Sequence, residues 1–207
     1  AFILKQARAL QLMQRFMIPS SGIIGPKQAV AAYSHILRTV TVIIIWRGPL
    51  IGRAITQFWE EVLWGKLDYL IVDLPPGTAD APLTVMQTLP VSGVIIVFTP
   101  QDLTAMIVRK AVRMAQQMGK AIVGVVENMS HLYVAEIDKK IEIFGKSRAK
   151  EMAQAAHAPL LGQLPIDPEL ARLCDEGNIE RYDSEVVSQL GQSLSQAMSN
   201  KEKQETS

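Results

Sequence analysis

The stretch DYLIVDLPPGTAD, residues 68–80, decides the fold class. Its first part, residues 69–72, is short and apolar, which is typical of a strand buried inside a sheet. This strand ends in an acid, Asp73, and a rigid double proline and Gly77 follow it. Nucleotide-hydrolysing proteins use a carboxylate at the end of a buried strand to hold Mg²⁺, with a glycine turn behind it that senses the γ-phosphate. An ordinary strand exit that ends in an aspartate is the alternative interpretation.

Strands and helices are predicted to alternate along the chain. Buried strands are expected at residues 40–45, 69–72, 94–98 and 121–126, with a further candidate at 159–164. Helical patterns occur at residues 51–63, 103–118, 146–156 and 185–198. Gly119 is placed to end the second of these helices. The alternation indicates an α/β fold, in which helices cover both faces of a mostly parallel sheet with right-handed crossovers.

The ends of these strands carry polar residues that could form one site. Ligands of parallel sheets bind beyond the carboxyl ends of the strands, where the loops meet. After the predicted strands come Asp73 and the polar loops 99–102, 127–130 and 165–168. Loops are polar in most proteins, and this alternative accounts for any one of the four. Their occurrence on one rim favours a binding site.

Composition sets broad limits on function. The 207 residues, 48% of them hydrophobic, are enough for one domain with a sizeable core. The net charge of +1 favours neither a nucleic-acid nor a membrane partner. No Asp or Glu occurs in residues 1–59, and organelle transit peptides are also poor in acidic residues. Because this acid-free run extends into the predicted core, a transit peptide is the less favoured interpretation. The longest apolar runs, 40–46 and 94–98, are too short to cross a bilayer. Cys174 is the only cysteine, which excludes an intramolecular disulfide and predicts a reducing, cytoplasmic location.

Taken together, these motifs resemble the Mrp/ApbC-type ATPases, which are iron–sulfur cluster carriers of the MinD/ParA class of P-loop proteins. The matching pieces are WRGPLIGRAITQF at 46–58, WGKLDYLIVDLPPGTAD at 64–80, the segment 91–130 that ends in VENMS, IFGKSRAKEMA at 143–153 and PLLGQLPIDPELARLCDEGNI at 159–179. They come in the family's order and close to its spacing, and the combination is far more specific than any single motif. The resemblance implies a three-layer α/β/α P-loop NTPase-like domain.

The resemblance also implies roles for five residues. Asp73 would be the Walker B acid, which holds Mg²⁺ through water, and Gly77 the switch glycine that faces the γ-phosphate. Asn128 would hydrogen-bond the adenine edge, since an amide offers a donor and an acceptor side by side. Pro165 and Asp167 would border the base from the opposite loop. Apart from the resemblance, a turn-forming side chain bonded to its own backbone is the alternative for Asn128.

The chain departs from the family pattern in its phosphate loop. The family's KGGxGKST loop, whose backbone N–H groups wrap the phosphates, does not occur in the sequence. The GKS at 145–147 lacks the glycine expected five residues earlier, and it is interpreted as a loop before a helix. We therefore expect a single domain over residues 1–199 whose N-terminal part is incomplete or divergent, and a disordered polar tail over 200–207. An intact mass of 22.8 kDa would contradict the incomplete N-terminus.

A second departure concerns the cysteine pair that many members carry after VENMS and use to bridge a cluster between two subunits. Here the stretch HLYVAEIDKKIEIFGK, residues 131–146, contains no cysteine, and thiolates are the usual ligands of such clusters. His131 is the one candidate nearby. Cys174 lies on a later predicted helix, where a small apolar role is the simpler interpretation. No iron–sulfur ligand is therefore identified, although the resemblance allows a cluster.

These observations predict an ATP-binding, slowly hydrolysing Mrp-type protein, with ATP and Mg²⁺ as ligands, that acts in iron–sulfur cluster assembly or transfer. ATPase activity would require that the intact protein supply the missing phosphate loop. The resemblance further implies a homodimer and iron–sulfur client proteins. A non-catalytic adaptor or degenerate paralogue of the same fold is one alternative, and ATP turnover would separate the two. A MinD/ParA-like positioning ATPase is another, but the tail 200–207 lacks the apolar stripe of a membrane-targeting helix.

Overall fold

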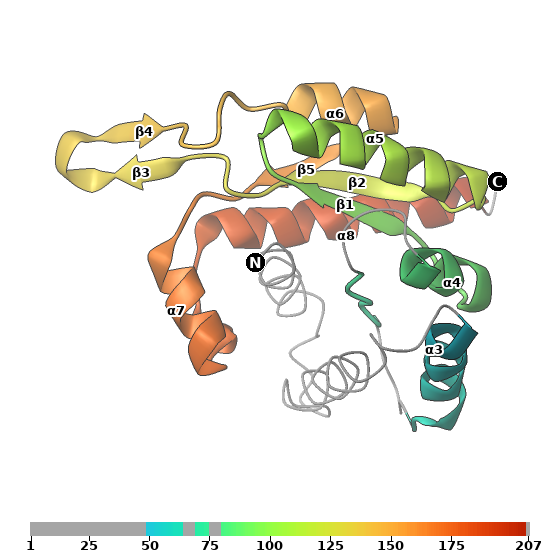
Figure 1. The fold of residues 1–207 in the computed structure, drawn as a ribbon. Helices are drawn as coiled ribbons and strands as arrows, with labels where there is room; N and C mark the ends of the chain where they lie inside the picture. Colours follow the sequence, from blue (N-terminus) through green and yellow to red (C-terminus); the bar gives the residue numbers. More distant parts are fainter. Residues whose placement is uncertain (1–48, 64–68, 75–79, 206–207) are drawn as a thin grey trace.

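The computed structural model describes residues 49–63, 69–74 and 80–205 (Figure 1). Its elements are, in chain order, α3 (Pro49–Glu61), α4 (Asp80–Thr88), β1 (Val94–Phe98), α5 (Asp102–Gln117), β2 (Ile122–Glu127), β3 (Leu132–Val134), η1 (Ala135–Ile137), β4 (Lys139–Ile141), α6 (Ala149–Ala156), β5 (Leu160–Gln163), α7 (Pro168–Glu176), η2 (Ile179–Arg181) and α8 (Glu185–Glu205). The predicted strand at residues 40–45 lies outside the described residues.

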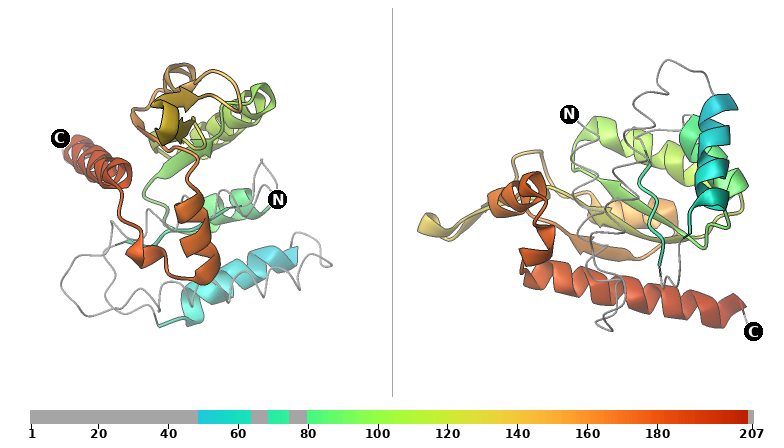
Figure 2. Two further views of the ribbon diagram at one scale, coloured as in Figure 1. Left: turned by 90° about the vertical axis from the view of Figure 1, so that its left-hand side faces the viewer. Right: turned by 90° about the horizontal axis from the view of Figure 1, so that it is seen from below.

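A parallel sheet with the strand order β1-β2-β5 forms the centre of the described part of the chain. The middle strand, β2, places Glu127 opposite Phe98 of β1 and opposite Gln163 of β5. α5 and α6 cover one face of this sheet, and α8 crosses the other face (Figures 1 and 2). The predicted three-layer α/β/α arrangement around a parallel sheet is therefore confirmed, as are the strands predicted at 94–98, 121–126 and 159–164, within one or two residues.

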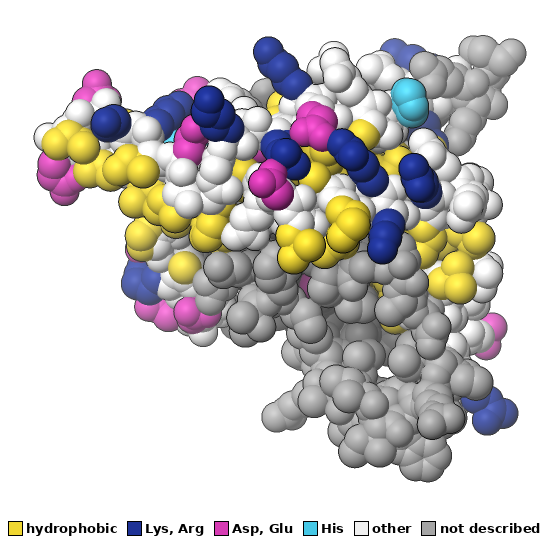
Figure 3. Space-filling model, turned by 45° about the horizontal axis from the view of Figure 1, so that its top comes forward, with side chains coloured by type: hydrophobic (Ala, Val, Ile, Leu, Met, Phe, Trp, Pro, Cys, Tyr) yellow, Lys and Arg dark blue, Asp and Glu magenta, His cyan; other side chains and the backbone are white. Residues whose placement is uncertain are grey.

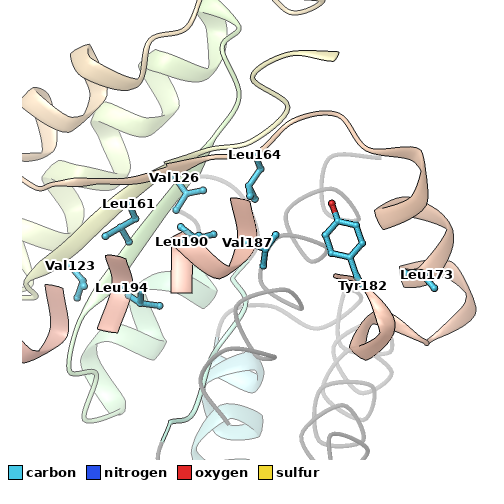
Figure 4. Close-up of a cluster of buried hydrophobic side chains, with 9 residues drawn as sticks. All are labelled: Val123, Val126, Leu161, Leu164, Leu173, Tyr182, Val187, Leu190 and Leu194. Atoms are coloured by element: carbon cyan, nitrogen blue, oxygen red, sulfur yellow. The ribbon is translucent and has the colours of Figure 1, made fainter. Parts of the chain in front are cut away.

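Two hydrophobic clusters fill the space on either side of the sheet, because successive strand residues point to opposite faces. Val125 is completely buried and joins Phe98 and Met152 in the cluster under α5 and α6. Val126 joins Leu190 in the cluster between the sheet and α8 (Figure 4). Both faces of β2 are thus covered, which explains why its sequence is apolar without alternation.

The first two predicted helices are found close to their expected ends. α3 and α5 match the helices predicted at 51–63 and 103–118 to within two residues. Gly119 adopts a left-handed φ of +65° just after α5, the conformation that glycine takes most readily when a helix ends. The helical spacing of apolar residues was therefore a sufficient signal in these two segments.

Two later helices differ from their predicted bounds. α6 begins at Ala149, later than predicted, because the residues before it turn to hydrogen-bond the buried Glu127. α8 continues to Glu205, so most of the tail 200–207 that was expected to be disordered is helical. Lysine, glutamate and glutamine favour helix, and Lys201 donates a hydrogen bond to a backbone carbonyl in the loop before β1.

The predicted strand at 69–72 is wrong: the described segment 69–74 is irregular and does not pair with β1, β2 or β5. A strand needs a hydrogen-bonded neighbour, and this segment contacts the sheet through a side chain instead. Ile71 packs against the cluster between the sheet and α8, while Tyr69 and Leu70 are 41% and 40% exposed. The segment therefore lies on the α8 side of the sheet.

A hairpin formed by β3 and β4 has no counterpart in the sequence-based prediction. It pairs Leu132 with Ile141, and Asp138 takes a left-handed φ of +46° at its turn. The hairpin extends away from the rest of the described chain (Figure 1), and hydrophobic side chains are visible along it (Figure 3). Tyr133 and Ile137 are two of its exposed residues. Each strand has only three residues, which is too short for an alternating pattern to stand out.

Gly124 of β2 allows the close packing of β2 against β5, and replacing it with alanine is expected to destabilise the fold. A Cβ atom at this position would lie 2.4 Å from Cγ of Leu161. Overpacking of this kind should lower the free energy of unfolding by about 1–3 kcal/mol, measured by urea titration. Gly162→Ala is the matched control, because its nearest side-chain atom, Cδ1 of Leu190, is 3.2 Å away. Equal losses in the two variants would contradict the prediction.

Candidate functional site at the carboxyl edge of the sheet

The loops that follow β1, β2 and β5 meet at the carboxyl edge of the sheet, as predicted from the order of the strands. The Asn128 N–H donates to the Phe98 carbonyl at 2.7 Å, which joins the exits of β1 and β2. The Leu164 N–H donates to the Glu127 carbonyl at 2.8 Å, and the Ser130 N–H donates to the Leu164 carbonyl at 2.9 Å. The exits of β2 and β5 are therefore held side by side.

Asn128 begins the loop after β2 and is 7% exposed. Its side-chain oxygen accepts a hydrogen bond from the Met129 N–H at 2.9 Å. Met129 itself has a left-handed φ of +57°, so the chain turns sharply at this point. The turn-forming role that was the alternative interpretation of Asn128 is thus part of what this side chain does.

Pro165 lies in the loop after β5, beside the loop after β2. The Ile166 N–H donates to the His131 carbonyl at 2.7 Å, and the Ser130 hydroxyl donates to the Leu164 carbonyl at 3.0 Å. These bonds lie on either side of Pro165, which is itself half-buried. Pro165 therefore lies on the same rim as the residues that follow β2, and its contact with a base stays a prediction.

Asp167 serves as the N-cap of α7. One carboxylate oxygen, Oδ1, accepts the N–H groups of Glu169 at 2.8 Å and Leu170 at 3.4 Å. The other, Oδ2, accepts the hydroxyl of Tyr182 at 2.5 Å. Burial and this hydrogen bond raise the pKa of Tyr182 to about 12, so the phenol remains a donor at neutral pH. Both oxygens thus have partners within the protein, and a contact of Asp167 with a base stays a prediction.

Asp73 is half-buried near the end of the segment 69–74, and Gly77 lies outside the described residues. The preceding Ile71 packs on the α8 side of the sheet. Strand alternation points Glu127 toward α6, so the next side chain, that of Asn128, is expected to leave on the α8 side. Asp73 and Asn128 are then expected on the same face, and a shared pocket for the two stays a prediction.

Sequence reasoning missed the residues that tie this edge together. The buried carboxylate of Glu127 accepts hydrogen bonds from the Ser147 hydroxyl at 2.7 Å, the Arg148 N–H at 2.7 Å and the Gln163 side-chain amide at 2.5 Å. The Arg148 guanidinium in turn pairs with Asp102, at the start of α5, at 2.8 Å. One signal was present in the sequence: Glu127 continues an apolar strand without a break, and a charge in that position must find partners in the fold.

Metal-binding and membrane-spanning features are absent from residues 49–63, 69–74 and 80–205. In these ranges no three His, Cys, Asp or Glu side chains could together hold a metal ion, and no helix has both the length and the hydropathy of a bilayer span.

Cys174 lies half-buried on α7, the helix expected for it. The His131 ring hydrogen-bonds the Ser130 hydroxyl at 2.9 Å, and burial, followed by the charge of Lys140, lowers its pKa.

Removing the cap of α7 is expected to destabilise the protein. Asp167→Ala should lower the free energy of unfolding by about 1–2 kcal/mol in a denaturant titration, because the first turn of α7 loses its acceptor. Asp167→Asn keeps an oxygen for those N–H groups and should lose less, while Tyr182→Phe removes only the bond to Oδ2. Unchanged stability of Asp167→Ala together with lost nucleotide binding would instead identify Asp167 as a binding residue.

Comparison with known proteins identifies a family whose model matches most of this chain. The model of the family described as "ParA: NUBPL iron-transfer P-loop NTPase" matches residues 3–200. A solved structure of a nucleotide-binding protein from Archaeoglobus fulgidus in complex with ADP is similar in fold, with a TM-score of 0.59 and 44% identity. The similarity covers 65% of this chain and 56% of that one.

Curated relatives named iron–sulfur cluster carrier protein are also similar to this chain. The one from Clostridium perfringens is 44% identical over 142 residues, which are 69% of this chain and 50% of the relative. Those from Aquifex aeolicus and Escherichia coli are 42% and 39% identical over 70% and 69% of this chain, and over 40% and 39% of their own lengths. The chain thus spans half or less of the length of these relatives.

Proposed function

This chain belongs to the ParA family of P-loop NTPases, of the NUBPL iron-transfer type, and we propose that it binds and slowly hydrolyses ATP in iron–sulfur cluster assembly or transfer. The observation that carries the proposal is the convergence of the β1, β2 and β5 exits on one edge, with Asn128 at its centre. Parallel sheets bind their ligands at this edge. The similar protein from Archaeoglobus fulgidus is a nucleotide-binding protein in complex with ADP, which supports a nucleotide as the ligand.

The types of the residues that the family resemblance singles out suit the parts of Mg·ATP that we assign to them. Asn128 would recognise the adenine edge, because a carboxamide can both donate and accept a hydrogen bond. Pro165 would lie along one side of the base. Asp73 would hold Mg²⁺ through bound water, since carboxylate oxygens are ligands that this cation favours. Gly77 would report the γ-phosphate. Mg²⁺, when bound, would neutralise charge that develops on the transferred phosphoryl group.

The cluster, the dimer and the client proteins are proposed from the family. An iron–sulfur cluster would be cargo of the protein, handed to client proteins in the cytoplasm, and two copies of the chain would form a homodimer. The described hairpin occupies the stretch after VENMS and carries no cysteine, so a cluster would need other ligands than the expected cysteine pair.

The intact protein, purified without oxygen, tests both halves of the proposal. We expect ATP binding by calorimetry, slow release of phosphate, and a visible charge-transfer absorption after incubation with ferric iron, sulfide and a thiol reductant. The cluster should then pass to an apo-protein acceptor. Cluster transfer without ATP turnover would favour the non-catalytic adaptor. Absence of both ATP binding and cluster uptake would refute the proposal.

A further inference from the structure

The carboxylate of Glu127 joins three elements at the point where the proposed adenine site begins. The residue is 0% exposed, and it immediately precedes Asn128. Its oxygens accept hydrogen bonds from Ser147, from the Arg148 backbone and from Gln163, which belong to the turn before α6 and to β5. All three donors are neutral groups. A buried polar group held by neutral donors adds little to stability, but its fixed partners define one geometry.

The same network fixes both ends of a long excursion of the chain. After Glu127 the chain turns at Met129, forms the hairpin of β3 and β4, and returns to the sheet at Ser147. The Glu127 carboxylate bonds the returning segment, so it holds the start and the return of this excursion together. Ser147 also accepts a hydrogen bond from Gln163 at 2.8 Å, which closes a triangle of three side chains.

We propose that Glu127 is a positioning residue for adenine recognition, whose carboxylate holds the end of β2 so that Asn128 presents its amide to the base. This inference rests on the proposed function. The backbone bonds from Asn128 to Phe98 and from Leu164 to Glu127 lie in the plane of the sheet and fix the strand end within that plane. The Glu127 side chain stands perpendicular to the plane of the sheet. It therefore fixes the rotation of the strand end about its own axis, and this rotation sets the direction of the Asn128 side chain.

The first test is Glu127→Gln. A carboxylate can accept all three donors, whereas a carboxamide offers one oxygen and turns an N–H₂ group toward the remaining donors. We expect the strand end to rotate and the Kd for ATP to rise about tenfold, the usual order for a disturbed buried polar contact. Because the displaced group is the Asn128 amide, which we propose to recognise adenine, the preference for ATP over GTP should fall as well. Both values can be measured by calorimetry on the intact protein.

A charge-swapped double variant tests the geometry rather than the charge. In E127Q/Q163E, the new amide can donate to the new carboxylate, the Ser147 hydroxyl can donate to the same carboxylate, and the Arg148 N–H keeps an acceptor. We expect this variant to recover ATP affinity to within about threefold of the natural protein. Glu185→Gln is the matched control, because Glu185 accepts from Gln189 in an exposed pair of the same chemistry at 3.1 Å.

The outcomes separate positioning from a merely structural role. Weaker ATP binding and lower base preference in E127Q, both restored by the swap and unchanged in E185Q, support the proposal. A lower Tm in E127Q with an unchanged Kd and base preference overturns it, and leaves the proposed function intact. No ATP binding by the natural protein refutes the proposed function and this inference with it. Should E127Q not fold, Ser147→Ala removes a single donor, and an unchanged ATP:GTP preference in that variant overturns the proposal.

Discussion

Replacing Asp73 with asparagine is expected to lower the rate of ATP hydrolysis about 100-fold or more, with ATP still bound. Asparagine keeps the size of the side chain but removes the negative charge that would hold the water shell of Mg²⁺. Loss of one group that stabilises developing charge in a transition state commonly costs about 10²–10³ in rate. Asp73 is half-buried near the end of the segment 69–74, which packs on the α8 side of the sheet through Ile71.

Phosphate release and calorimetric ATP binding, measured on the same preparation at saturating Mg²⁺, check this prediction. The exposed Asp183 is the matched control, and Asp183→Asn should hydrolyse ATP at the natural rate. Natural turnover in Asp73→Asn would show that this acid does not act on the metal. A loss of ATP binding equal to the loss of turnover would instead indicate that Asp73 supports the pocket itself.

Replacing Phe98 with alanine is expected to produce the largest loss of stability, about 3–5 kcal/mol in the free energy of unfolding. Phe98 is 2% exposed and fills the cluster between β1, β2 and the helices α5 and α6. Its removal leaves a cavity directly under the carboxyl edge, because the Phe98 carbonyl accepts the N–H of Asn128. ATP affinity should therefore fall together with stability.

Chemical denaturation followed by circular dichroism measures this loss. Leu103→Ala is the control, because Leu103 at the start of α5 is 69% exposed, and its truncation should change stability by no more than about 0.5 kcal/mol. A loss below about 1 kcal/mol for Phe98→Ala would mean that the sheet and α5 close over the cavity, and that this cluster is less rigid than its burial indicates.

The sequence was informative where a local pattern decides the structure. The spacing of apolar residues and the composition of each segment were sufficient to locate β1, β2, β5, α3 and α5. Buried parallel strands are short apolar runs, and amphipathic helices repeat their apolar residues every three or four positions. The order of these elements then predicted that the polar loops would meet on one edge, as Asn128 and Pro165 do. The family resemblance added the roles, which the residue types alone left open.

The rest depended on partners distant in sequence. The segment 69–72 has the composition of a strand, but only a neighbour can make it one, and Ile71 packs on a face of the sheet instead of pairing along an edge. Tyr182, fifteen residues along the chain, is a partner of Asp167 that the sequence did not reveal, and the contact of Asp167 with a base stays a prediction. The partners of Glu127 lie twenty or more positions along the chain, at separations of 20, 21 and 36 residues, where no periodicity can reveal them.

The hairpin formed by β3 and β4 is a suitable place to attach a label that follows conformational changes of this protein. The chain departs from and rejoins the sheet beside one carboxylate, so the loop between β3 and β4 can be lengthened without shifting the register of β2 against β5. A short peptide tag or a fluorophore grafted at Asp138, far out on this arm, would leave the core untouched. The signal of such a label would then report conformational changes at the carboxyl edge of the sheet, where the hairpin begins and ends.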